Sequence, residues 1–315
     1  MPSFESPAVR TPTTAEDDPR VGTLLGRAVD DPGDARVVLL GFPSDEGVRV
    51  NGGRTGAAEA PGAIRRALYA LTPDARRPDA FADLLRHTVD LGDLVLGDDL
   101  AESQERLGKA LAPHLARGAV PVVLGGGHET AFGHFLGYVE AGRPVAILNW
   151  DAHADVRPLK DGCPHSGSPF RQALEHPSGA CRGYTVAGLQ PHSTARAHVD
   201  YLDAQDAYYA WCDELSENLV DALYAGGTAT ACMTTFDLDA VDQGAAPGVS
   251  APAANGMAPA LWLHAAYRAG RSPHVASMDL VECNPRVDVD GRTARLAALT
   301  VWHFLRGLAE RGSNA

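Results

Sequence analysis

Short apolar runs recur along this chain of 315 residues, and most end at glycine, proline or a polar residue. Runs that are apolar at nearly every position are typical of strands covered on both faces, as in parallel sheets. The pattern predicts strands at residues 35–42, 89–91, 119–124, 145–150, 184–189, 206–211, 231–237 and 274–281. Helical spacing of apolar positions predicts helices at residues 63–71, 103–116, 216–225, 258–269 and 293–311.

This alternation of strands and helices predicts the fold class. It favours a single three-layer α/β domain, with a mostly parallel sheet of about eight strands flanked by helices. We find no internal repeat and no linker-like stretch after residue 35, so we expect one domain over residues 35–315. Residues 1–34 are rich in Pro, Thr, Asp and Glu, and there we expect a mobile N-terminal tail or an edge segment.

Composition narrows the classes of partner. The chain has 27 Lys and Arg against 40 Asp and Glu, a net charge of −13, which argues against nucleic acid or an anionic membrane as partner. No apolar run approaches the ~20 residues of a membrane span, and the first residues do not resemble a secretory signal. The five cysteines are an odd number without a C-x-x-C pair, so we expect reduced thiols and a cytoplasmic protein.

Three predicted strands end in clusters of potential metal ligands, at the edge where open α/β sheets bind their ligands. The first cluster, residues 125–129, offers His128 after three glycines that permit a tight turn. A histidine that only hydrogen-bonds its loop would fit that cluster equally well. In the second cluster, Asp151, His153 and Asp155 are two residues apart, which directs all three to one side of an extended chain. Without a cation these groups would repel and desolvate one another.

Asp237 and Asp239 form the third cluster, again two residues apart at the end of an apolar strand. Either could cap a helix or a turn, but their coincidence with the other clusters favours a metal site. The candidate ligands are His128, Asp151, His153, Asp155, Asp237 and Asp239. Two divalent ions that share bridging carboxylates use this many ligands, and oxygen-rich sites with imidazole suit Mn²⁺ best. Such a pair generates hydroxide at neutral pH, so we expect a hydrolase.

In this order, the three clusters resemble the motifs of the ureohydrolase family, which includes arginases, agmatinases, guanidinobutyrases and formimidoylglutamases. The resemblance covers nearly the whole chain after residue 35. Within the family, the chain most resembles formimidoylglutamases, and the similar stretches are residues 45–57, 127–131, 166–172 and 246–253. The resemblance implies an arginase-like fold, two manganese ions per subunit and a homo-oligomer, either a trimer or a hexamer.

The resemblance also implies roles for single residues. His128, Asp151, Asp155 and Asp237 would hold one manganese ion, and Asp151, His153, Asp237 and Asp239 the other. Asp155 would also hydrogen-bond the hydroxide that bridges the metals and pass its proton to the leaving amine. Glu282 matches the acidic residue that grips the amidine or guanidine group.

One position departs from the arginases and agmatinases, which have a proton-shuttling histidine directly before the glycine that is Gly167 here. This chain has Ser166 at that position, as formimidoylglutamases commonly do. His165, one residue earlier, is our candidate for a replacement shuttle.

Formimidoylglutamate carries two carboxylates, so a chain of net charge −13 must bind it through local cations. Arg171 is our first candidate, because a guanidinium fits a carboxylate bidentately. The further candidates are Ser166, Asn51, Arg49, Arg54 and Arg157.

We therefore expect manganese-dependent hydrolysis of the linear amidine N-formimidoyl-L-glutamate to L-glutamate and formamide, in histidine degradation. Two alternatives stay open: a guanidino hydrolase (guanidinobutyrase or agmatinase) that releases urea, and a non-catalytic metal-binding homologue. A zinc deacetylase would need two adjacent histidines, and this sequence has none. An effect of Cys163 oxidation, close to the predicted substrate loop, also stays open.

Overall fold

A computed structural model describes the chain apart from residues 1, 7, 8, 10, 16, 28–32, 226–229 and 312–315. Its strands form one ten-stranded sheet in the order β1-β4-β3-β5-β10-β9-β6-β7-β8, with β2 also paired to β4. The bounds are β1 Phe4–Glu5, β2 Gly26–Arg27, β3 Val37–Gly41, β4 Thr88–Leu94, β5 Val120–Leu124, β6 Val145–Trp150, β7 Cys181–Leu189, β8 Tyr208–Trp211, β9 Ala231–Asp237 and β10 Val275–Val281. Every pair is parallel except β1 with β4. The eight predicted strands are confirmed as β3 to β10.

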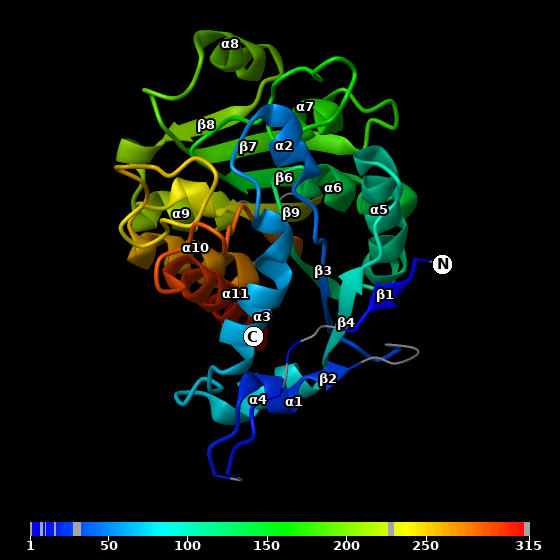
Figure 1. Cartoon of the computed structure of the whole chain (residues 1–315), viewed down its shortest axis with the longest axis vertical. Coiled ribbons are helices and arrows are strands. Elements are labelled where there is room, and N and C mark those ends of the chain that lie inside the picture. The colour runs from blue at the N-terminus through cyan, green and yellow to red at the C-terminus, as the bar shows by residue number, and fades with distance from the viewer. Residues whose placement is uncertain are drawn as a thin grey trace.

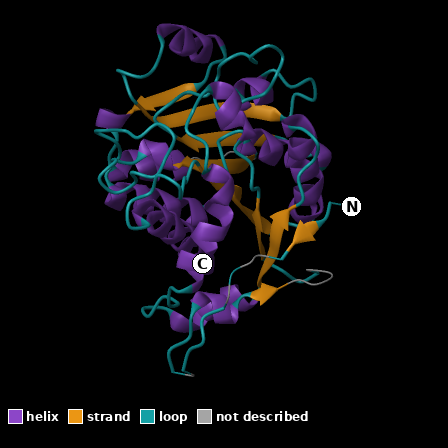
Figure 2. Ribbon diagram, viewed as in Figure 1, coloured by secondary structure: helices purple, strands orange, loops and turns teal. Residues whose placement is uncertain are grey.

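Helices cover both faces of the sheet, so the predicted three-layer α/β class is confirmed (Figures 1 and 2). One layer contains α3 Ala60–Tyr69, α9 Glu217–Ala225, α10 Pro259–Arg271 and α11 Arg292–Ala309. The other contains α5 Leu100–Ala116, α6 Thr130–Glu140 and α7 Pro169–Leu174. The remaining helices are α1 Val21–Leu24, α2 Glu46–Asn51, α4 Pro78–Arg86 and α8 Arg196–Ala204. None of these described helices is both long and apolar enough to cross a membrane.

Each central strand contributes to two hydrophobic cores, one on each face of the sheet. In β3, Val37 and Leu39 belong to the core under α3 and α11, whereas Val38 and Leu40 belong to the core under α5 and α6. Successive side chains of a strand point to opposite faces, so a strand between two helical layers must be apolar at every position. This is the physical reason why the sequence pattern located the strands.

The N-terminal segment differs from a mobile tail in its described parts. Phe4 and Glu5 pair with β4 at the edge of the sheet, and Gly26 and Arg27 also pair with that strand. Val21 in α1 is fully buried in the core. These residues therefore form an edge segment of the sheet, which was the second of the two interpretations of the sequence.

Four adjacent strands place the functional groups. Their order is β5-β10-β9-β6, at the centre of the sheet. Because these strands are parallel, their carboxyl ends meet at one edge, and the three ligand clusters of the sequence follow β5, β6 and β9 there.

Candidate metal centre

The first group of candidate ligands surrounds the ring of His128, just beyond β5. Its Nδ1 atom lies 3.2 Å from Asp151 Oδ2, 3.0 Å from Asp155 Oδ2 and 2.9 Å from Asp237 Oδ2. His128, Asp151 and Asp237 are buried, and the Asp155 side chain is 13% exposed. One ligand atom from each of the four residues therefore converges on a single point.

A second group adjoins the first and shares Asp151 with it. The Nδ1 atom of His153 lies 3.1 Å from Asp239 Oδ2 and 3.5 Å from Asp151 Oδ1. The structure thus brings together all six residues that the sequence proposed as ligands. Their two overlapping groups are the arrangement that a pair of ions with a shared carboxylate requires.

Polar atoms without partners test whether a metal fits. His128 Nδ1 and Asp239 Oδ1 are buried, yet neither has a hydrogen bond of acceptable geometry among the described residues. Leaving such atoms unsatisfied costs ~1–3 kcal/mol each. Ligands at right angles around an ion, each ~2.1 Å from it, are about 3 Å apart, which matches the distances around His128. The residues fit a divalent cation in each group.

The pKa values of the clustered residues, taken without a metal, also indicate a site for cations. Burial raises the pKa of Asp237 well above its usual range, and the charges of Asp239 and Asp151 raise it further. Burial alone would lower the pKa of His128, but Asp237, Asp151 and Asp155 outweigh it and hold that pKa well above 6.5. The charge of Asp239 is the main cause that raises the pKa of His153. Protons therefore neutralise the cluster where cations would otherwise do so.

Glu282 follows β10 and completes the rim of the site. Its Oε1 atom accepts a hydrogen bond of 2.9 Å from the backbone N–H of His128, while its buried Oε2 has no partner among the described residues. Burial is the main cause that raises the pKa of Glu282, followed by the charges of Glu129 and Asp239. One carboxylate oxygen is thus fixed and the other is available for a ligand.

Neighbours that the sequence did not identify hold the ligands in place. Asn149 Nδ2 donates to Asp151 Oδ2 at 2.9 Å and to the Tyr184 hydroxyl at 3.1 Å. The ring of Phe170 meets the His128 ring edge-on, with centroids 5.1 Å apart. The sequence offered one signal for Asn149, its spacing from Asp151. It lies two residues before Asp151, so in an extended chain both side chains point to the same side.

His165 does not join the metal cluster. Its Nε2 atom lies 3.0 Å from the Pro158 carbonyl oxygen, and its Nδ1 accepts a hydrogen bond of 3.1 Å from the N–H of Gly167. Both ring nitrogens are therefore used within the loop that leads to α7. This conformation leaves no ring nitrogen for the shuttle role that we predicted.

Ser166, Asn51 and Arg157 form a polar cluster beside the metal ligands. Asn51 Nδ2 donates to Ser166 Oγ at 3.1 Å, and Arg157 Nη1 donates to Asn51 Oδ1 at 3.2 Å. Arg157 is exposed and lies two residues after Asp155, on the segment that carries the ligands. Of the candidate arginines, Arg157 is the one that lies on this segment and donates to Asn51.

The other candidate arginines are engaged elsewhere. Arg171 donates to Glu175 Oε1 at 3.0 Å, and its guanidinium lies over the Tyr201 ring, 4.6 Å from the centroid. Arg54 donates to the backbone carbonyls of Ser250 and Val249. Arg49 pairs with Glu46 in the exposed first turns of α2.

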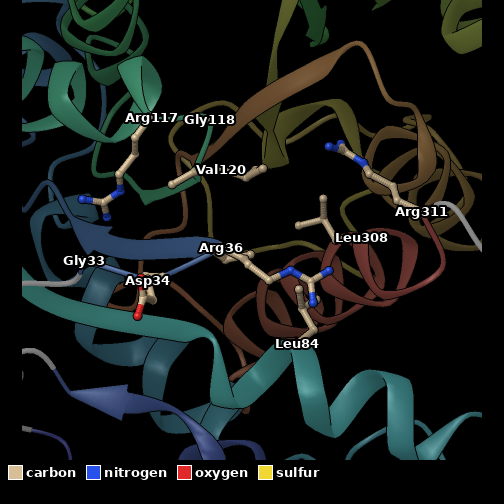
Figure 3. A pocket seen from close by; sticks show the side chains of 12 residues that line it. Gly33, Asp34, Arg36, Leu84, Arg117, Gly118, Val120, Leu308 and Arg311 are labelled. Carbon is tan, nitrogen blue, oxygen red and sulfur yellow. The ribbon is translucent and has the colours of Figure 1, made fainter.

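A separate cavity of about 400 Å³ lies at the opposite edge of the sheet, where β3 and β5 begin. Figure 3 shows Arg36, Arg117 and Arg311 around it. Arg36 pairs with Asp83 at 3.1 Å, and Arg311 donates to the carbonyls of Gly270 and Val275. Among the described residues that line this cavity there is one carboxylate, Asp34, and this lining does not resemble a metal centre.

Comparisons with known proteins agree with this geometry. The model of the Arginase family matches residues 35–306. The chain is 39% identical over 295 residues to the formimidoylglutamase of Geobacillus kaustophilus (strain HTA426). The aligned residues cover 90% of this chain and 88% of that protein. It is 40% identical over 274 residues to the formimidoylglutamase of Rhodococcus opacus (strain B4). This alignment covers 83% of this chain and 82% of that protein.

Solved structures have the same fold. The crystal structure of Trypanosoma cruzi formiminoglutamase with Mn²⁺ superposes with a TM-score of 0.85 at 34% identity, over 94% of this chain and 100% of that one. Formimidoylglutamase from Bacillus subtilis gives a TM-score of 0.86 at 25% identity, over 97% and 98%. The family model and the relatives together cover nearly all of the domain predicted from the sequence. The chain belongs to the arginase family.

Proposed function

We propose that this protein is a manganese-dependent hydrolase that converts N-formimidoyl-L-glutamate and water to L-glutamate and formamide. The observation that carries the proposal is the pair of overlapping ligand groups, which share Asp151 at the carboxyl edge of the sheet. The identity to formimidoylglutamases over more than four fifths of the chain supports the choice of substrate within the family.

The six clustered residues would hold two manganese ions, one in each group. Bound there, the ions would lower the pKa of water and so supply a nucleophile at neutral pH. Asp155 would accept the proton lost by the attacking water, since its carboxylate is one of the groups that converge at the first metal position, 3.0 Å from His128 Nδ1. The same carboxyl group would then protonate the departing glutamate nitrogen, so that glutamate leaves as a neutral amine.

Glu282 would bind the amidinium group of the substrate. Its Oε2 atom has no partner among the described residues and lies in a carboxylate that is fixed by the N–H of His128. A carboxylate that accepts an N–H from an amidinium binds that group and orients its carbon for attack.

The substrate carboxylates would bind at the cluster of Arg157, Asn51 and Ser166. Arg157 supplies a cation, and the amide and hydroxyl groups supply additional hydrogen bonds. This assignment replaces Arg171, because Glu175 and Tyr201 already occupy the guanidinium of that residue. Agmatine has no carboxylate and would leave the charge of Arg157 without a partner.

Substrate profiling tests the proposal. Manganese-loaded protein should release glutamate from N-formimidoyl-L-glutamate, and a chelator should abolish that release. Agmatine, guanidinobutyrate and arginine, assayed for urea, are the comparison substrates. Urea release without glutamate release would establish the guanidino hydrolase instead, and failure on every substrate with manganese bound would favour the non-catalytic homologue.

We extend the proposal to a cytoplasmic homo-oligomer. The sequence features already described support the compartment, and family resemblance supports the oligomer. Light scattering on the purified protein measures the oligomeric state directly, and a monomer at all concentrations would contradict this part.

A further inference from the structure

A chain of hydrogen bonds runs from the metal centre into the sheet, behind His128. The Nδ1 atom of this ring faces the carboxylates, and its Nε2 atom lies 3.0 Å from Thr235 Oγ1. The Thr235 hydroxyl in turn donates to Asp279 Oδ1, and Asp279 Oδ2 lies 2.7 Å from His134 Nδ1. Side chains of all four residues are buried.

The strand register explains how these groups meet. Thr235 of β9 and Asp279 of β10 are direct partners across two adjacent parallel strands. Thr235 also lies two residues before Asp237, so both side chains point to the same face of β9. On this face α6 covers the sheet and contributes His134, whose Nε2 atom lies 2.6 Å from Ser277 Oγ.

The direction of the chain determines the tautomer of His128. Asp279 Oδ1 accepts the hydrogen bond that the Thr235 hydroxyl donates, and Asp279 Oδ2 faces the His134 ring. The single hydroxyl proton of Thr235 is used in that bond, and its oxygen is left to accept. His128 therefore donates from Nε2, so in the neutral ring that binds a metal the lone pair is on Nδ1, the atom that faces Asp151, Asp155 and Asp237.

We propose that Thr235 and Asp279 are positioning residues that fix the tautomer and orientation of the His128 ring for metal binding. This inference rests on the proposed function, because it assumes that His128 binds a metal. Neither residue belongs to the ligand groups, and the hydrogen bond from Thr235 to the His128 ring is their connection to the metal centre. Removing such an outer partner of a histidine ligand weakens metal binding by about 10- to 100-fold in metalloenzymes generally.

The chain offers a matched control one residue away. Thr234 is as fully buried as Thr235, but its hydroxyl lies on the other face of β9, 3.1 Å from the Tyr224 hydroxyl. Thr234→Val and Thr235→Val remove the same hydroxyl from neighbouring positions of one strand. Any general cost of a buried valine in β9 is therefore common to both variants.

Manganese titration of chelator-treated protein, followed by the electron paramagnetic resonance signal of free Mn²⁺, measures the affinity without an activity assay. We expect Thr235→Val to weaken at least one of the two sites by about 10- to 100-fold. We expect Thr234→Val to stay within about threefold of the natural chain, and Thr235→Ser to restore binding because it keeps the hydroxyl. Asp279→Asn should weaken the same site, and thermal unfolding of each metal-free variant checks that it is folded.

Unchanged affinity in Thr235→Val, or equal weakening in Thr234→Val, would overturn the inference and leave the proposed function intact. A natural chain that binds no manganese in the same titration would contradict the proposed function and this inference with it.

Discussion

Glu282 combines an unusual backbone with an available carboxylate oxygen. Its φ of 65° lies in the left-handed region, which residues other than glycine, asparagine and aspartate seldom adopt. Such a conformation costs ~1–3 kcal/mol and persists only where the surroundings enforce it. Here the N–H of Glu282 donates to the Gly126 carbonyl at 2.8 Å, and its side chain accepts from His128. The strained turn thereby holds Oε1 against the N–H of His128 and leaves Oε2 buried without a partner among the described residues.

Replacement of Glu282 by glutamine tests its role toward the amidinium. The amide keeps the volume of the side chain but presents an N–H where the substrate also has N–H groups. Loss of a hydrogen bond to a charged group costs ~1.5–3 kcal/mol, so we expect kcat/KM to fall by about 10- to 100-fold. Steady-state glutamate release measures this, and metal analysis should still find two manganese ions. An unchanged kcat/KM would remove Glu282 from substrate binding.

Arg157 and Arg171 make a matched pair for the substrate carboxylates. We expect Arg157→Ala to raise KM for N-formimidoyl-L-glutamate by about tenfold or more, since it removes a cation beside the metal ligands. Arg171→Ala should leave KM within about twofold, because that guanidinium is bound by Glu175 and Tyr201. The opposite order of KM values would return the assignment to Arg171.

At this scale the sequence predicted which candidate ligands lie together, but not the contact between Arg157 and Asn51. His128, Asp151 and Asp237 follow apolar strands, and the strand pattern locates their position at the edge of the sheet. Arg157 and Asn51 meet because the loop after β6 folds against the end of α2, at 106 residues of sequence separation. No periodicity in the sequence encodes that contact.

Among the elements, strands were easier to predict than helices near the site. Each strand between two helical layers is apolar at nearly every position, so its signal is strong. Helix α6 is not among the stretches for which we named helical spacing, and it contains Gly133 and Gly137, which are poor helix formers. Packing explains those glycines: a Cβ atom on Gly137 would lie 2.8 Å from Leu111 Cβ of α5. Close packing of α5 against α6 thus outweighs the low helix propensity of glycine.

A buried ion pair joins α3 to the sheet, far from the metal centre in sequence. Arg65 is fully buried and donates to both carboxylate oxygens of Asp90, at 2.8 and 2.9 Å, and also to Asp93. Arg65→Met would leave Asp90 buried without a cation, so we expect the free energy of unfolding to fall by ~3–5 kcal/mol. Urea unfolding followed by circular dichroism measures this loss.

Arg196 provides the control for that experiment. It pairs with Asp200 in α8, where the two side chains are 79% and 57% exposed. Exposed pairs contribute ~0–1 kcal/mol, so Arg196→Met should shift the urea midpoint little. Equal shifts for the two variants would contradict the view that burial of the Arg65 pair makes its loss costly.

On the scale of the whole molecule, a chain of net charge −13 brings four aspartates and two histidines together in two overlapping groups. The raised pKa of His128 means that its proton stabilises the metal-free fold below pH 6.5, the ordinary value. That stabilisation is lost as the pH rises through the raised pKa, whereas metal binding requires the deprotonated ring.

Manganese should therefore stabilise the protein more as the pH rises. We expect the apparent affinity to increase by about tenfold per pH unit for each proton displaced, from pH 6 upward. Thermal unfolding with manganese and with chelator, compared at pH 6, 7 and 8, measures the difference. A difference that stays constant, or shrinks with pH, would show that the ligands are not protonated in the metal-free fold.

The most direct test follows glutamate release while manganese is added back to chelator-treated protein. If the two overlapping ligand groups supply the catalytic centre, release from N-formimidoyl-L-glutamate rises from zero and saturates at two manganese ions per chain. Full glutamate release before any manganese is added, or none at two bound ions per chain, would contradict the account.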